Sequence, residues 1–152
     1  MTKAARLARS SDLASLLRLF DISDVSASAS AEVRETIWRE TLEQPGLALF
    51  VAPVGDEVVA TAMLITAPNL LRSGRRHGFL ENVVTHPDFR DVGHGSAVVQ
   101  AALDHGWRIG CHHVLMQSGR KDERVHAFYE GLGFRPGLRT AYVAYPPGNS
   151  IV

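Results

Sequence analysis

The feature that most constrains this chain is a predicted strand, turn and helix in direct succession. Residues 79–85 (FLENVVT) are mainly apolar and β-branched, which predicts a strand. Residues 95–109 repeat apolar side chains at helical spacing and stop at Gly110, which predicts an amphipathic helix. Between them lies Arg90-Asp91-Val92-Gly93-His94-Gly95, with two glycines where the helix opens. Free N–H groups, the helix dipole and an arginine can converge there on a phosphate.

Common nucleotide motifs do not describe this turn. The third glycine of the dinucleotide fingerprint is replaced by Val98, and no Gly-x-x-x-x-Gly-Lys-Ser/Thr run exists. By itself, the turn is equally compatible with an ordinary strand-to-helix connection.

The rest of the sequence predicts one mixed α/β or α+β domain. We expect it to cover residues 1–146, with a flexible tail at 147–152. A first helix is expected to begin at the N-cap Ser11, and Gly55-Asp56 is expected to close a hairpin. The predicted strands, besides 79–85, are 3–9, 47–53, 58–67, 113–117 and the final segment 138–145; the further helices are 31–43 and 122–132.

Composition excludes several classes of function. Lys and Arg number 16 and Asp and Glu number 16, so the neutral chain is poorly suited to nucleic acid or an anionic membrane. The longest apolar stretch, 58–68, is about half of the roughly 20 residues that a spanning helix needs. Cys111 is the single cysteine, which excludes an internal disulfide, and no signal peptide is evident. A cytoplasmic protein is expected.

A second motif lies downstream, where Tyr129, Gly133 and Phe134 match Tyr-x-x-x-Gly-Phe. Together with Arg90, Gly93 and Gly95, which match Arg/Gln-x-x-Gly-x-Gly/Ala, this order resembles the GCN5-related N-acetyltransferase (GNAT) superfamily. The resemblance implies a central mixed sheet flanked by helices, and an enzyme that is commonly a homodimer.

The same resemblance implies that acetyl-CoA binds in a gap between splayed strands, here 79–85 and 113–118. An amine would attack the thioester directly, with no acyl-enzyme. Strand backbone would bind the pantetheine arm and the amides of 92–96 would hold the pyrophosphate. The implied cofactor-binding residues are Val83, Val84, Arg90, Asp91, Val92, Gly93, His94, Gly95, Ser96, Asp122 and Phe128. Asp122 stands where many members have Asn; it should still cap the helix.

Two residues are candidates for catalysis. The resemblance implies that Tyr129 protonates the leaving thiolate; the alternative is a core tyrosine. Glu81 interrupts an apolar strand, so we expect burial to raise its pKa toward that of a useful base, although it could instead position substrate. Strand alternation places Phe79, Glu81 and Val83 on one face and Leu80, Asn82 and Val84 on the other.

Other side chains have less specific expectations. The amide of Val83 or Val84, freed by a family β-bulge, is the implied oxyanion donor. Asn82 is a candidate substrate contact, His86 a less favoured base, and His94 is expected to face solvent. No metal site is expected: His112 and His113 are adjacent, which places them on opposite faces of a strand.

The acceptor is predicted to be a small primary amine. Arg72, Arg75 and Arg76 cluster before the key strand, so they suit a phosphate or carboxylate on the acceptor, which could be an amino sugar or another anionic amine, or else they form a solvated loop. A protein lysine or N-terminal acetyltransferase and a non-catalytic acyl-CoA sensor are the alternatives.

Overall fold

The computed structural model describes residues 3–148. The chain is divided into two compact units, Met1–Met116 and Gln117–Val152. The prediction of one domain over 1–146 concerns both units together and stays a prediction. Within the predicted tail, residues 149–152 lie outside the described residues.

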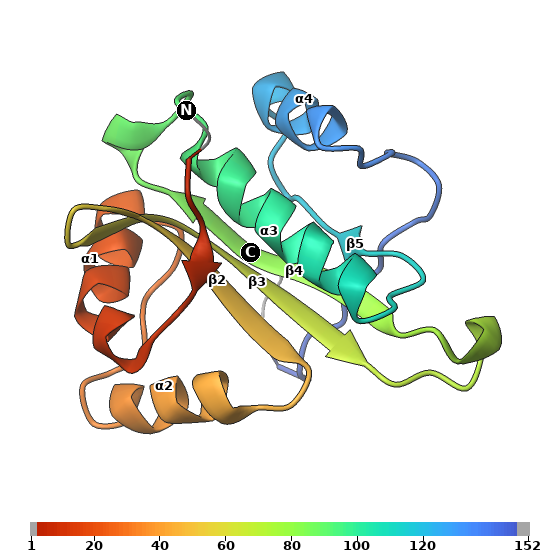
Figure 1. The fold of residues 1–152 in the computed structure, drawn as a ribbon, viewed down its shortest axis with the longest axis horizontal. Coiled ribbons are helices and arrows are strands. Elements are labelled where there is room, and N and C mark those ends of the chain that lie inside the picture. Colours follow the sequence, from red (N-terminus) through yellow and green to blue (C-terminus); the bar gives the residue numbers. More distant parts are fainter. Residues whose placement is uncertain (1–2, 149–152) are drawn as a thin grey trace. The chain divides into compact units, whose positions relative to one another are not determined.

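A five-stranded sheet forms the centre of the first unit (Figure 1). Its strands follow the sequence order and are antiparallel, except that β4 and β5 run parallel. The predicted hairpin is confirmed, because Gly55 adopts a positive φ of 59° between β2 and β3. The strands are β1 (Arg6–Leu7), β2 (Leu47–Val54), β3 (Glu57–Ala67), β4 (His77–Thr85) and β5 (Leu115–Met116).

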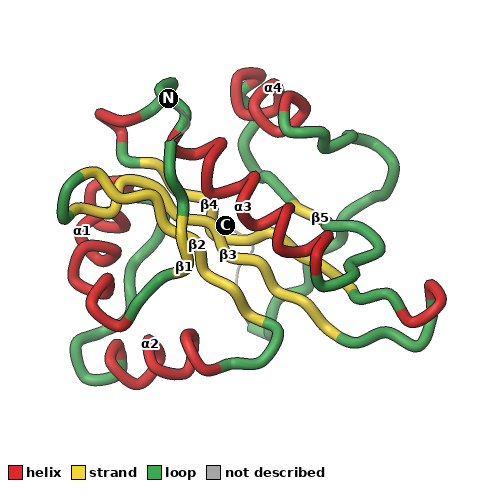
Figure 2. Tube along the Cα trace, in the orientation of Figure 1, coloured by secondary structure: helices red, strands yellow, loops and turns green. Residues whose placement is uncertain are grey.

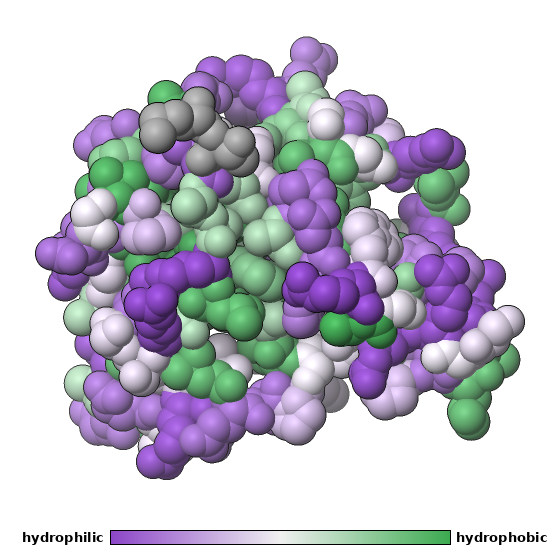
Figure 3. All heavy atoms as spheres, in the orientation of Figure 1, coloured by the Kyte–Doolittle hydropathy of each residue, from purple (hydrophilic) through white to green (hydrophobic). Residues whose placement is uncertain are grey.

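Helices α1 (Leu13–Ser23) and α2 (Arg34–Glu43) cover one face of this sheet. Their core packs against alternate β2 side chains, Leu49 and Val51. Phe50 points to the other face, where its ring contacts His105 of α3 (His94–Arg108) edge-on at 5.7 Å. Figure 2 shows α3 crossing the strands, and hydrophilic side chains gather over α2 in Figure 3.

Helix α3 packs closely against the sheet at Gly106. A Cβ on Gly106 would lie 3.4 Å from Leu64 Cδ2, which is ordinary van der Waals contact, so alanine would fit there without moving the helix.

Asp12, and not Ser11, is the residue at the start of α1, so the predicted cap is wrong. Ser11 lies in a short 3₁₀ helix, Ser10–Asp12. The Asp12 carboxylate accepts hydrogen bonds from the Arg6 guanidinium at 2.7 and 2.9 Å and from the Arg9 N–H at 2.7 Å. Arg6, followed by the Arg9 N–H, lowers the pKa of Asp12 against the opposing effect of burial. This ion pair ties β1 to the helix.

The second unit contains helix α4 (Glu123–Gly131), which confirms the predicted helix. Asp122 caps it, because its Oδ1 accepts from the Arg124 N–H at 2.9 Å. Gly133 has a φ of 94° and donates its N–H to the Glu130 carbonyl, 3.0 Å away, closing the last turn.

The predicted final strand is wrong. Residues 138–145 form no strand in the described part of the chain, and their large side chains Leu138, Tyr142 and Val143 are exposed. An apolar pattern alone does not make a strand, because a strand needs a hydrogen-bonded neighbour. The first and last strands of the sheet are likewise shorter than the predicted 3–9 and 113–117.

Across residues 3–148, no helix combines the length and the hydrophobicity required to span a bilayer.

Asp12→Asn is expected to destabilise the fold by about 1–3 kcal/mol at pH 7, since it removes charge-assisted hydrogen bonds from a buried acceptor. The lowered pKa means that this stability is present above the unfolded-state pKa, about 4, and is lost as pH falls through the folded pKa. Urea unfolding at several pH values measures both effects. Glu57→Gln, which breaks the exposed ion pair to Arg18, is the control and should cost less. Equal losses would contradict the role assigned to Asp12.

Candidate functional site

A β-bulge interrupts β4 at the centre of the predicted site. Thr61 pairs with Val84 and Met63 with Glu81, so Asn82 and Val83 both lie opposite the single residue Ala62. Asn82 has a φ of 50°, in the left-handed region that Asn tolerates better than most residues. The family bulge expected here is therefore present. A bulge leaves one residue outside the regular ladder, which is how an N–H group becomes available.

The extra residue also corrects the predicted alternation. Glu81 shares the α1/α2 face with its partner Met63, and beyond the bulge the side chain on that face is Val84, which joins the core. Val83 does not continue the alternation from Glu81, because the bulge shifts it by one position.

Glu81 and Asn82 are both exposed, so the expected burial of Glu81 is wrong. Only the segment of β4 near Val84 reaches the helical core. The Glu81 side chain is therefore in contact with solvent and has no buried environment.

The other edge of β4 is open over much of its length. β5 pairs in parallel with β4 at Phe79 and Leu80 only, so no β5 partner is recorded for residues 81–85 in the described chain. This pairing agrees with the predicted divergence of the two strands. An unpaired strand edge offers N–H and C=O groups to any extended chain that carries amides.

The predicted phosphate turn follows β4 directly. A 3₁₀ helix (Pro87–Phe89) leads into it, Asp91 has a φ of 60°, and Gly93 has a φ of 94° at the N-cap of α3. Gly93 has no side chain to accept hydrogen bonds from the first turn of α3. The N–H groups of that first helical turn are directed toward the glycine turn. Arg90, Asp91 and Val92 are exposed, whereas Gly95 is buried and Ser96 is half-buried.

His94 is buried at 4% exposure, so the expectation that it faces solvent is wrong. The ring of Phe89 lies edge-on to it at 5.8 Å, and His86 lies edge-on to Phe89 at 5.2 Å. Burial, and then the nearby Lys3, lower the pKa of His94, so its ring is neutral at pH 7. Sequence reasoning missed this ring stack because its members have no helical or strand spacing.

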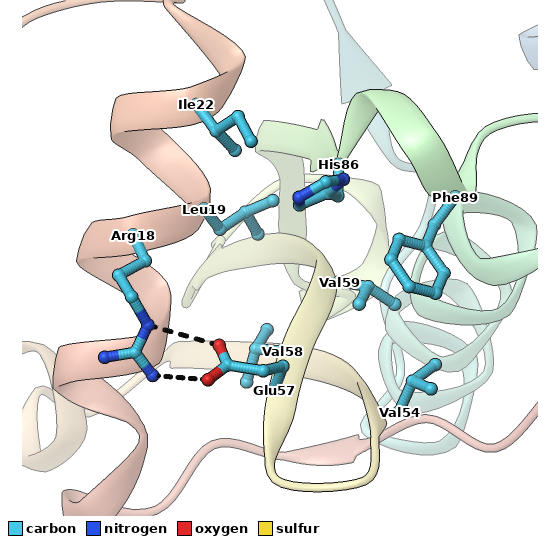
Figure 4. A pocket seen from close by; sticks show the side chains of 9 residues that line it. All are labelled: Arg18, Leu19, Ile22, Val54, Glu57, Val58, Val59, His86 and Phe89. Carbon is cyan, nitrogen blue, oxygen red and sulfur yellow. Dashed lines mark hydrogen bonds and ion pairs between the residues drawn. The ribbon is translucent and has the colours of Figure 1, made fainter.

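His86 has a local structural role. Its Nδ1 accepts from the Asp88 N–H at 3.1 Å, which caps the 3₁₀ helix. The residue also lines a pocket of about 390 Å³ in the first unit (Figure 4). Apart from His86, the less favoured base, none of the predicted site residues lines this pocket, whose walls are Arg18, Leu19, Ile22, Val54, Glu57, Val58, Val59, His86 and Phe89.

Tyr129 lies on α4 in the second unit, between two aromatic neighbours. Its ring lies edge-on to Phe128 at 5.0 Å and to Phe134 at 5.8 Å, and the Phe134 N–H donates to the Tyr129 carbonyl at 3.1 Å. Burial raises the pKa of Tyr129, against a smaller opposing effect of Arg120. The phenol therefore keeps its proton at neutral pH and can act as a donor.

The three loop arginines lie at the opposite end of β4 from the phosphate turn. Arg72 has a φ of 54° in an exposed turn. Arg75 donates to the Cys111 carbonyl at 3.0 Å, and the Arg76 backbone bridges to Cys111 and exchanges hydrogen bonds with Gly110 and His112. Of the three arginines, Arg72 is the one that is exposed and makes none of these contacts with residues 110–112. Cys111 is buried.

Among residues 3–148, no group of three or more His, Cys, Asp or Glu side chains is arranged to hold a metal ion.

Comparison with known proteins identifies the family. Residues 13–134 match the acetyltransferase (GNAT) family. A glucosamine 6-phosphate N-acetyltransferase from Trypanosoma brucei brucei is 36% identical over 83 residues, covering 55% of this chain and 54% of that protein. The chain therefore spans about half the length of this curated relative.

Solved structures agree with the family match. A putative acetyltransferase from Agrobacterium tumefaciens strain C58 is 35% identical, with a TM-score of 0.85 over 93% of this chain and 99% of that one. Glucosamine-6-phosphate N-acetyltransferase from Arabidopsis thaliana, 21% identical, has a TM-score of 0.80 over 93% and 97% of the two chains and shares the fold. The family match over residues 13–134 and these structural similarities lead to one conclusion: the chain belongs to the GNAT family of acetyltransferases.

Proposed function

We propose that this protein transfers the acetyl group of acetyl-CoA to a primary amine of a small molecule, namely an amino sugar or another anionic amine. GNAT acetyltransferases use acetyl-CoA as the acetyl donor. One observation carries the proposal: the open edge of β4 beyond Leu80 leads directly into a turn whose helix has glycine at its N-cap.

The residues of this segment fit the chemical parts of CoA. Pantetheine carries amide groups, which suit the backbone of Val83 and Val84 at the unpaired edge. Diphosphate suits the N–H groups at residues 92–96 and the exposed Arg90 guanidinium. Asp122 is occupied in capping α4, so a contact from it to pantetheine would use its remaining carboxylate oxygen, and Phe128 would supply apolar contact.

Three groups are proposed to stabilise negative charge or transfer protons during acetyl transfer. A bulge amide at Val83 or Val84 would donate to the carbonyl oxygen as it gains negative charge. The Tyr129 phenol, which retains its proton, would donate it to the departing sulfur. Glu81, exposed on β4, would take up the amine proton directly or through water, and Asn82 would orient the acceptor.

The acceptor proposal rests on the basic loop. Arg72 is exposed, and its own loop carries no acidic residue between Pro68 and Gly78. A phosphate or carboxylate on the acceptor would be attracted to it, and Arg75 and Arg76 would add positive charge. The trypanosomal relative is named for a phosphorylated amino sugar, which supports the same class.

A cytoplasmic homodimer without nucleic-acid or membrane partners is part of this proposal. The exposed Leu138, Tyr142 and Val143 are the surface that a second copy would cover.

An acetyl-transfer assay with a panel of amines tests the activity. Thiol release with phosphorylated amino sugars is expected to exceed that with the uncharged sugars. Arg72→Gln should raise KM for the phosphorylated acceptor about 3- to 10-fold and leave KM for the uncharged one unchanged, whereas Arg39→Gln on α2 should change neither. Label transferred only to proteins, or CoA binding without any thiol release, would overturn the small-molecule proposal.

Gly93→Val is expected to weaken CoA binding at least about 10-fold, because a branched side chain at φ 94° distorts the turn. Gly110→Val is the matched control: it introduces the same residue at φ 88° at the other end of α3. Both variants should lose stability in urea unfolding, but only Gly93→Val should lose CoA affinity in calorimetry. Equal CoA affinities in the two would remove the turn from the binding site.

Tyr129→Phe is expected to lower kcat by about 100-fold while changing CoA affinity less than about twofold, because only the proton donor is removed. Since burial raises the pKa of Tyr129, any alkaline loss of kcat due to its ionisation should lie at higher pH than an ordinary tyrosine would give, and it should be absent in the variant. Tyr142→Phe, at an exposed tyrosine, is the control. Unchanged kcat in Tyr129→Phe would exclude the phenol from the reaction.

A further inference from the structure

Lys3 lies beside the phosphate turn, although it is separated from that turn by most of the first unit's sequence. A Cβ built on Gly93 would lie 3.6 Å from Lys3 Cγ, which places the lysine side chain directly against the N-cap of α3. The positive charge of Lys3 also reaches His94, whose pKa it helps to lower. In Figure 1 the first described residues run next to the start of α3.

The sequence of the turn itself supplies no net positive charge. Between Pro87 and Ser96 the charged residues are Arg90 and the two aspartates Asp88 and Asp91. His94 contributes no charge because it is buried and neutral at pH 7. The segment is therefore net negative, which opposes the binding of a diphosphate.

We propose that Lys3 is a binding residue of the CoA site, whose ammonium contacts the diphosphate held by the turn around Gly93. This inference rests on the proposed function, because it requires CoA at that turn. Lys3 is exposed, so its flexible side chain can follow the ligand without a desolvation cost comparable to that of a buried charge. It offsets the negative charge of Asp91 at the position where anionic oxygens would bind.

The sequence offers no signal for this role. Lys3 precedes the first strand and has no motif relation to residues 90–95. Pairing of β1 with β2 and the crossing of α3 over the sheet bring the two segments together.

Calorimetric titration of untagged protein with CoA and with 3′-dephospho-CoA tests the proposal. Lys3→Gln should lower the affinity for both ligands by the same factor, roughly 3- to 10-fold, since both carry the diphosphate. Lys3→Arg should restore affinity to within about twofold. The factor should shrink as salt rises from about 50 mM to about 500 mM, because an exposed contact is screened.

Arg39→Gln removes the same charge from α2, on the other face of the sheet, and should leave both affinities unchanged. An effect on CoA alone would assign Lys3 to the 3′-phosphate and overturn the diphosphate contact, and equal affinities of wild type and Lys3→Gln would overturn any role of Lys3. Those two results leave the proposed function standing. Failure of the wild type to bind CoA would overturn both proposals.

Discussion

The pairing of strand β4 is the constraint on which the rest of the first unit depends, because its two edges differ in how far they are hydrogen-bonded to neighbouring strands. The β3 edge is paired along nearly its whole length, which anchors β4 in the sheet. The β5 edge is paired only at Phe79 and Leu80, which leaves backbone groups available beyond them. The bulge at Asn82 and Val83 adds a residue within this open stretch. A rigid strand can therefore offer main-chain hydrogen bonds to a ligand without losing its own position.

The two ends of β4 differ in their chemistry. The basic loop with Arg72 precedes its first residue, and the glycine turn with Gly93 follows its last. An extended strand of this length separates such groups by roughly 25–30 Å, so a single phosphate cannot contact both. This separation supports the proposal of two distinct anionic groups, one on the acceptor and one on CoA. Beside the turn, the ring of Phe89 makes edge-on contacts with the rings of His86 and His94.

Several parts of this arrangement were predictable because they depend on neighbours in sequence. The glycine turn, the α3 helix, the Gly55 hairpin and the Asp122 cap each follow from local spacing and residue type, and all are present. The prediction failed where distant contacts decide. Burial of His94 depends on Phe89, exposure of Glu81 depends on how far the α1/α2 core extends, and Asp12 is held by Arg6. The segment 138–145 had a strand-like pattern but no strand neighbour in the described residues.

The sequence by itself determined the family and the backbone geometry of the turn, because glycine, arginine and tyrosine at fixed spacings form the family's motifs and glycine permits the positive φ at residue 93. Tertiary structure decided which side chains face the core, where the bulge shifts the register of β4, and which distant charge joins the turn. Lys3 illustrates the difference. Its charge is visible in the sequence, but the position of that charge beside the turn depends on β1 and α3 being packed on the same sheet. Electrostatic interactions depend on distance in space, which spacing along the chain does not specify.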